Sequence, residues 1–210
     1  MIKGQTKRIG IFGRSGCGKS TLAKQLIKDI DRLVVYDTLC EYEEQGCKVA
    51  RSIVQLLKLA RQRRFKIAYQ PDIESVHEKE LRKVAEALLL IQKPYQEGRA
   101  YPQITLMIEE MSLAIPNKTG GDVQIMQNLA NMGRHYGINL IGIAQRPANV
   151  NATFRGSLTE QYFFSMVEPL DIDEVGKKIG RENAEMLRKL PNHQAFRYSD
   201  GRIENHFNTL

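Results

Sequence analysis

Short apolar runs alternate along the chain with longer segments in which apolar residues recur every three or four positions. The short runs predict strands near residues 8–12, 32–37, 65–70, 104–108, 139–144 and 161–167. The longer segments predict helices near residues 19–30, 52–63, 78–92, 122–136 and 171–189. Strands that alternate with helices are typical of an α/β fold with a mainly parallel central sheet flanked by helices.

Two segments depart from this alternation. Near the C-terminus, AFRYSDGRIENHF contains an Asp-Gly turn between two alternating runs, which predicts a small C-terminal β-hairpin. Residues 111–121 (MSLAIPNKTGG) contain Pro116 and a Gly-Gly pair, and we expect a loop there. No linker, internal repeat or low-complexity tract interrupts the chain, so we expect residues 1–210 to form a single domain.

The composition narrows the class of partner. A net charge of +7 and a pI of about 9.3 suit a negatively charged partner such as nucleic acid or nucleotide, although a basic surface can also serve solubility alone. An odd number of cysteines, three, argues against a disulfide framework. The longest uninterrupted apolar run, ALLLI, is far too short to cross a bilayer, so we expect no transmembrane segment.

The strongest motif is GRSGCGKS at residues 13–20, which fits G-x-x-x-x-G-K-[ST] between a predicted strand and a predicted helix. Glycines let the backbone N–H groups point inward, and the helix N-terminus adds partial positive charge. A glycine-rich turn without a ligand would not need a strand before it and a helix after it. The motif predicts binding of ATP with Mg²⁺, with Lys19 on the β- and γ-phosphates and Ser20 on the metal. The nucleotide-binding set is Gly13, Arg14, Ser15, Gly16, Cys17, Gly18, Lys19, Ser20 and Thr21.

Cys17 lies inside this loop. A helix N-terminus can lower the pKa of a thiol and make it reactive, which would suit a redox switch. The position tolerates many residue types in this motif, so we interpret Cys17 as a variable loop residue.

A second motif, ITLMIEE at residues 104–110, is an apolar strand that ends in two carboxylates. Carboxylates at the end of a buried strand are costly without partners, and a cation and a reacting water would supply them. We expect Glu109 to hold the Mg²⁺ shell and Glu110 to act as general base. The alternative is a solvated acidic pair at a strand exit.

A third motif is Gln145, which ends the predicted strand NLIGIA and precedes Arg146 and Pro147. Small-molecule kinases usually place the acidic strand next to the phosphate-loop strand, whereas motor ATPases insert a strand with a polar tip between them. If residues 139–144 form that inserted strand, Gln145 faces the γ-phosphate, and the Arg146-Pro147 turn relays the nucleotide state to neighbouring surfaces.

Together, GRSGCGKST, LMIEE and GRHYGINLIGIAQRPANV resemble the FtsK/HerA superfamily of DNA-pumping ATPases over residues 8–167, with the last block the specific one. In its small size, the chain most resembles the genome-packaging ATPases of membrane-containing, tailless double-stranded DNA viruses and phages. The resemblance implies a RecA-like (ASCE) P-loop NTPase core and a ring, usually a hexamer, that pumps double-stranded DNA through its channel.

The resemblance also implies an arginine finger donated by the neighbouring subunit, which we assign to Arg134 or Arg155 rather than Arg146. It implies portal, capsid-vertex or viral membrane proteins as partners, and a place in the host cytoplasm at the viral procapsid. Glu109 departs from the family, which more often has Asp there. We therefore expect slower or metal-sensitive turnover.

Contacts to DNA would be made to phosphates without sequence preference. Two groups of basic residues are candidates for these DNA contacts, although each could be a solvated surface. The loop 111–121 is the candidate for a loop that lines the DNA channel. The groups are Arg61, Arg63, Arg64 and Lys66, and Lys177, Lys178, Arg181, Arg188 and Lys189.

Three other functions share part of this pattern. A small-molecule or nucleoside kinase would need an acceptor pocket and an arginine-rich lid, which we do not find in the sequence. A conjugation or export coupling ATPase acting on single-stranded DNA normally carries a membrane segment. A regulator that binds nucleotide without turnover would not need Lys19, Ser20, Glu109, Glu110 and Gln145 together.

Overall fold

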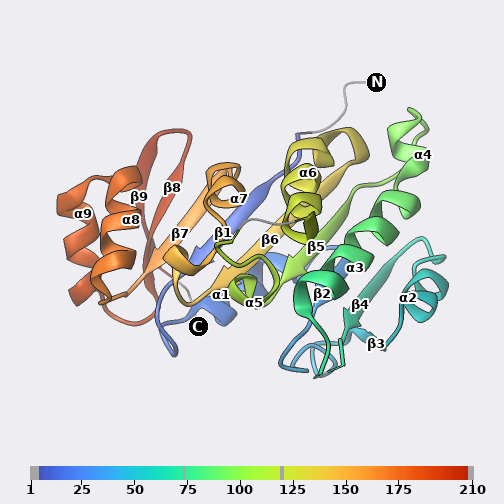
Figure 1. The fold of residues 1–210 in the computed structure, drawn as a ribbon, viewed down its shortest axis with the longest axis horizontal. Helices are drawn as coiled ribbons and strands as arrows, with labels where there is room; N and C mark the ends of the chain where they lie inside the picture. Colours follow the sequence, from blue (N-terminus) through green and yellow to red (C-terminus); the bar gives the residue numbers. More distant parts are fainter. Residues whose placement is uncertain (1–4, 73, 119–120, 208–210) are drawn as a thin grey trace.

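The fold is built on one nine-stranded sheet with helices on both faces (Figure 1). A computed structural model describes residues 5–72, 74–118 and 121–207. The strand order is β3-β4-β2-β5-β6-β1-β7-β8-β9, and only the β7–β8 and β8–β9 pairs are antiparallel. The strands are β1 (Arg8–Phe12), β2 (Arg32–Tyr36), β3 (Lys48–Ala50), β4 (Phe65–Tyr69), β5 (Ile104–Ile108), β6 (Ile138–Ala144), β7 (Glu160–Phe164), β8 (Gln194–Ser199) and β9 (Arg202–Phe207).

Helices fill the connections between the parallel strands. The α-helices are α1 (Lys19–Ile27), α2 (Ile53–Leu59), α3 (His77–Ile91), α4 (Lys93–Gln96), α5 (Met111–Ala114), α6 (Gly121–Tyr136), α7 (Ala152–Gly156), α8 (Pro169–Ile179) and α9 (Arg181–Met186). Two 3-10 helices, η1 (Pro147–Asn149) and η2 (Leu187–Lys189), complete them. None of the helices within the described part of the chain has both the length and the apolar composition needed to cross a bilayer.

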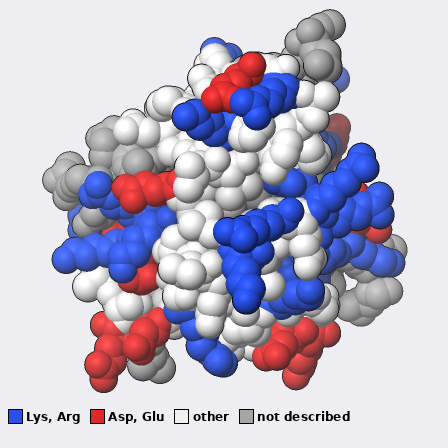
Figure 2. Space-filling model, turned by 90° about the vertical axis from the view of Figure 1, so that its right-hand side faces the viewer, with Lys and Arg blue, Asp and Glu red and all other residues white. Residues whose placement is uncertain are grey.

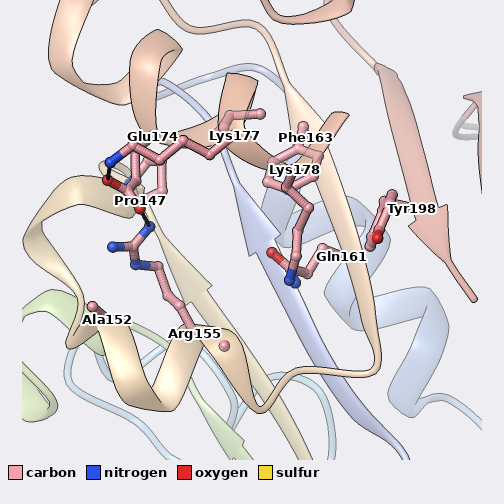
Figure 3. A pocket seen from close by; sticks show the side chains of 11 residues that line it. Pro147, Ala152, Arg155, Gln161, Phe163, Glu174, Lys177, Lys178 and Tyr198 are labelled. Atoms are coloured by element: carbon pink, nitrogen blue, oxygen red, sulfur yellow. Dashed lines mark hydrogen bonds and ion pairs between the residues drawn. The ribbon is translucent and has the colours of Figure 1, made fainter. Parts of the chain in front are cut away.

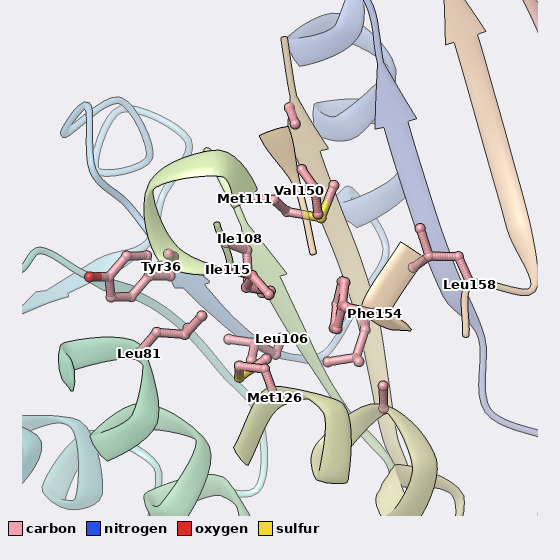
Figure 4. Packing of buried hydrophobic residues seen from close by; sticks show 14 of the residues in the cluster. Tyr36, Leu81, Leu106, Ile108, Met111, Ile115, Met126, Val150, Phe154 and Leu158 are labelled. Atoms are coloured by element: carbon pink, nitrogen blue, oxygen red, sulfur yellow. The ribbon is translucent and has the colours of Figure 1, made fainter. Parts of the chain in front are cut away.

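The central strands are buried on both faces because their side chains alternate between two hydrophobic clusters. Met107 of β5 faces the cluster under α1, while its neighbours Leu106 and Ile108 face the cluster under α3, α5 and α6. Figure 4 shows this second cluster, in which side chains from the sheet and from the helices above it meet. The predicted α/β class with a mainly parallel sheet is therefore confirmed.

The predicted C-terminal hairpin is also confirmed. β8 and β9 pair in antiparallel register, with Ser199 opposite Arg202. The two turn residues, Asp200 and Gly201, have φ values of 51° and 76°. Two consecutive positive φ angles match the two-residue turn that fits the twist of a hairpin. Because β8 also pairs with β7, the hairpin extends the main sheet.

Two predicted segments are wrong in detail. The predicted helix 171–189 is divided at Gly180, whose φ of 84° cannot continue a right-handed helix, into α8, α9 and η2. The predicted loop 111–121 begins with α5, where Glu110 caps the helix N-terminus, and its last residue, Gly121, starts α6. Thr119 and Gly120 of that segment lie outside the described residues.

Candidate active site

The strand order brings the three motifs to one edge of the sheet. β6 lies between β1 and β5 and is parallel to both, with Phe12 beside Ala144 and Ile108 beside Gly142. The carboxyl ends of these three strands therefore meet at the same edge. The phosphate loop, the Glu109-Glu110 pair and Gln145 each follow one of these ends, as expected if residues 139–144 form the inserted strand.

The phosphate loop takes the backbone conformation that its glycines permit. Gly13, Gly16 and Gly18 all have positive φ, at 149°, 73° and 106°. A Cβ at Gly13 would lie 2.6 Å from the Cβ of Phe164, so only glycine fits between β1 and β7. The Gly13 N–H also donates to the Ala144 carbonyl at 3.3 Å, which fixes the loop to the end of β6.

Lys19 starts α1 and points back across the loop. Its side chain is 8% exposed, and its Nζ donates to the Arg14 carbonyl oxygen at 2.7 Å. Burial of the ammonium lowers the pKa of Lys19 below its ordinary value, because the charged form loses hydration. A phosphate group in the loop would restore the lost stabilisation of that charge.

Cys17 does not have the environment of a reactive thiol. It is buried in the cluster beneath α1, and burial raises the pKa of the thiol despite the nearby Lys19 ammonium. The helix N-terminus therefore does not outweigh desolvation here. Cys17 packs as a small apolar residue, while its backbone carbonyl accepts from the N–H of His193 at 2.8 Å.

A cavity of about 560 Å³ opens at this edge of the sheet. It is lined by residues from all three predicted motifs, while Arg134 and Arg155 do not line it. The lining residues that the sequence predicted are Ser15, Gly16, Lys19, Ser20, Glu109, Glu110 and Gln145.

Glu110 is held by the first turn of α5. Its carboxylate Oε1 accepts from the N–H of Ser112 at 3.2 Å and from the Ser112 hydroxyl at 2.5 Å. Helix α5 itself lies against β6 at Gly142, where an added Cβ would be 2.2 Å from Sδ of Met111. The glycine in the strand IGIA thus lets the segment carrying Glu110 lie close to the strand that ends in Gln145.

Glu109 lies deeper than Glu110. It is 5% exposed, and its Oε2 accepts from the Leu39 N–H at 3.4 Å. Burial, together with the neighbouring carboxylate of Asp37, raises the pKa of Glu109 to about 8. Asp37 is itself fully buried and accepts from the N–H groups of Glu41 and Tyr42. A cation bound beside these two carboxylates would oppose this shift and favour their charged form.

This raised pKa predicts a pH dependence of stability. The folded chain binds the Glu109 proton more tightly than the unfolded chain does, so its contribution is complete below about pH 4.5 and is lost as the pH rises to about 8. We expect the melting temperature, measured without nucleotide or Mg²⁺, to show this fall, and Glu109→Gln to remove it. Glu43→Gln, at an exposed neighbouring site, should retain it. An unchanged fall in Glu109→Gln would contradict the assignment.

The sequence analysis did not assign a role to two polar residues at the end of β2. Asp37 and Thr38 follow β2, which pairs with β5, and Thr38 lines the cavity. The Thr38 hydroxyl is buried without a hydrogen-bond partner among the described residues. The signal was available in RLVVYDT, an apolar strand that ends in two polar residues just as ITLMIEE does. This pattern indicates a site residue only because β2 is the neighbour of β5 in the sheet.

The turn after β6 is fixed by a residue far along the chain. Gln145 is exposed and lines the cavity, and Arg146 Nε donates to Asp171 Oδ2 of α8 at 3.0 Å. The other oxygen of Asp171 accepts from the Ala148 N–H at 3.1 Å. Asp171 is 1% exposed. The sequence did not reveal it, and it connects the Gln145 turn to α8.

The two arginine-finger candidates lie in different settings. Arg134 is exposed in the last turn of α6, at the amino edge of the sheet and away from the phosphate loop. The Arg155 side chain is 12% exposed, pairs with Glu174 at 3.0 Å and donates to the Val150 carbonyl. Arg155 is therefore engaged within its own chain.

The candidate channel loop is tied to the turn after β6. Pro116 and Val150 form an isolated antiparallel bridge, and the Asn117 N–H donates to the Asn149 carbonyl at 2.8 Å. The Asn151 amide also donates to the Lys118 carbonyl at 3.2 Å. The described part of this loop is thus bonded to the segment that follows Gln145.

No protein-family model and no curated protein matches the chain. Among solved structures it is similar to the genome packaging NTPase B204 from Sulfolobus turreted icosahedral virus 2 in complex with ATP-gammaS. That match has a TM-score of 0.78 and 19% identity over 97% of this chain and 98% of the other. A second is EssC (ATPases 2 and 3) from Geobacillus thermodenitrificans, with a TM-score of 0.60 and 14% identity. That match covers 96% of this chain and 39% of the EssC chain.

A third is the pCW3 conjugation coupling protein TcpA with ATPgS, at TM-score 0.57 and 17% identity over 97% of this chain and 60% of the other. At these identities the matches establish the fold. The resemblance seen in the sequence is thus confirmed at that level: this chain has the P-loop ATPase fold that viral genome-packaging and conjugation coupling ATPases share.

Proposed function

We propose that the chain is an ATPase that hydrolyses ATP to move double-stranded DNA during viral genome packaging. The observation that carries the ATPase part is the cavity in which Lys19, Glu110 and Gln145 converge from the segments that follow three adjacent strands. The strand between β1 and β5 favours hydrolysis over phosphate transfer by a small-molecule kinase, in which those two strands usually adjoin.

The residues present fit ATP with Mg²⁺. Ser20, Thr38 and Glu109 supply oxygen ligands of the kind that magnesium prefers, and the Thr38 hydroxyl lacks a partner among the described residues. When bound, the metal neutralises charge on the phosphate oxygens. Lys19 binds the β- and γ-phosphates, Glu110 takes a proton from the attacking water, and Gln145 positions that water or senses the γ-phosphate.

The packaging part rests on the likeness to B204, described as a genome packaging NTPase, over nearly the whole of both chains. We propose a single ATPase domain over residues 1–210 that assembles into a ring, a hexamer by the family resemblance, in the host cytoplasm. It would dock on portal, capsid-vertex or viral membrane proteins. Arg134 is the better candidate for the trans arginine finger, because Arg155 pairs with Glu174 of its own chain.

The first basic group is the better candidate for DNA contact. Arg61, Arg63 and Arg64 are exposed at the turn between α2 and β4. Figure 2, which faces the side carrying α2 to α4, shows many Lys and Arg side chains over that side of the molecule. Arg64 pairs with Asp31, which leaves Arg61 and Arg63 most available. In the second group, Lys177 and Arg188 are paired with glutamates.

The test is ATP turnover with and without long double-stranded DNA. We expect DNA to stimulate the wild type, and the double variant Arg61→Glu, Arg63→Glu to lose the stimulation while basal turnover stays unchanged. The salt dependence of DNA binding should become shallower, with a slope smaller by about one for each DNA phosphate that the variant no longer neutralises. The matched control is Arg181→Glu, Lys189→Glu, which reverses two exposed charges in the second group.

Two outcomes would contradict the proposal. Transfer of phosphate to a nucleoside would indicate a kinase. Stimulation by single-stranded DNA alone would favour the conjugation coupling function, for which the likeness to TcpA is the supporting observation.

A further inference from the structure

A second cavity, of about 270 Å³, lies between α7, α8 and the strands β7 and β8 (Figure 3). Its walls include Pro147, Arg155, Gln161, Lys177, Lys178 and Tyr198. It shares no lining residue with the nucleotide cavity, although Arg146 lines one and the adjacent Pro147 lines the other. Its contents are thus separate from the nucleotide.

Positive charge in this cavity exceeds negative charge. Arg155 and Lys177 both pair with the Glu174 carboxylate, at 3.0 and 2.8 Å. Lys178 has no carboxylate within ion-pair distance among the described residues. Its Nζ lies 5.4 Å from the ring centroid of Tyr198. Two of the three cations therefore share one carboxylate, and the half-buried Lys178 ammonium is the one without a counter-charge among the described residues.

A buried hydrogen-bond donor also lines this cavity. Gln161 of β7 is 3% exposed, and its side-chain Nε2 has no hydrogen-bond partner among the described residues. Both residues line the cavity, and in Figure 3 the end of the Lys178 side chain overlaps the Gln161 amide in the view. A buried donor without an acceptor is costly, and so is an ammonium without a counter-charge.

We propose that this cavity binds a small anionic oxygen group, a phosphate or a carboxylate, between Lys178 and Gln161. One such group satisfies both unmet requirements, because its oxygens accept from the amide and its charge balances the ammonium. A volume of about 270 Å³ holds a phosphate or a short carboxylic acid and is small for a nucleotide. Burial and the nearby Arg155 charge lower the pKa of Lys178, which agrees with an ammonium that lacks its counter-ion.

The test is a calorimetric titration of the full chain with inorganic phosphate and, separately, with succinate. A non-hydrolysable ATP analogue with Mg²⁺ is present throughout, so that the phosphate loop is filled. We expect saturable binding at one site, weakened at least about tenfold in Lys178→Met, which keeps the unbranched side chain but removes the charge. Lys189→Met, an exposed lysine in η2, is the matched control and should bind as the wild type does.

The two probes separate the sources of the anion. Binding of phosphate alone identifies a phosphate site, binding of succinate alone a carboxylate site, and binding of both the shared chemistry. Binding of neither probe, or equal binding by wild type and Lys178→Met, would overturn the proposal.

A second variant tests the same site without a ligand. Gln161→Glu supplies a carboxylate beside Lys178, so we expect it to raise the melting temperature and abolish binding of both probes. If instead Gln161 and Lys178 form only a structural pair through the amide oxygen, Gln161→Glu would leave probe binding as it is in wild type. That outcome would also overturn the proposal.

Discussion

Replacing Glu110 with glutamine is expected to reduce ATP turnover by at least about a hundredfold, the lower range of what a positioned general base contributes. The Glu110 carboxylate lines the nucleotide cavity and is oriented by two hydrogen bonds from Ser112. Glutamine has the same shape but cannot accept a proton from water. Nucleotide binding should therefore be retained, so turnover and binding of a fluorescent ATP analogue are measured side by side.

Ser112→Ala gives the matched control for orientation. It removes the hydroxyl that contacts Glu110 while keeping the carboxylate, so we expect a smaller loss than in Glu110→Gln. Turnover by Glu110→Gln within a few-fold of the wild type would show that another group is the base. Loss of nucleotide binding in the same variant would indicate that Glu110 holds the ligand instead.

Replacing Lys19 with alanine is expected to weaken nucleotide binding and to reduce turnover by at least about a hundredfold, comparable to the loss of one preorganised charge-stabilising group. The Lys19 ammonium is buried at the mouth of the loop, and its Nζ already points to the Arg14 carbonyl at 2.7 Å. Its removal takes away the one lysine side chain of the phosphate loop that would balance the phosphate charge. Unlike Glu110→Gln, this variant should lose both functions.

Lys28→Ala is the control, because Lys28 is exposed at the C-terminal end of the same helix, about two turns away. It should bind and hydrolyse ATP as the wild type does. A stable, folded Lys19→Ala protein with full ATP affinity would contradict the assignment of the phosphate loop. Circular dichroism of both variants establishes that they are folded.

Local patterns predicted the elements well where one short stretch carried all the information. The phosphate loop needs only its glycines and the lysine that follows them, and the hairpin needs only Asp200 and Gly201. The helix break at Gly180 was missed because apolar residues continue at helical spacing on both sides of it. The short helix α5 was missed because Pro116 and the Gly-Gly pair dominated the reading of its segment.

The α/β class, the phosphate loop and the acidic strand end could be predicted from the sequence, because each depends on residues that are neighbours in the chain. Which distant residues meet depends on the tertiary structure. Only the pairing of β2 with β5 brings Asp37 against Glu109, and only the packing of α8 sets Asp171 on the turn after Gln145. Those contacts depend on strand order and helix packing across long sequence separations, which hydrophobic periodicity does not encode.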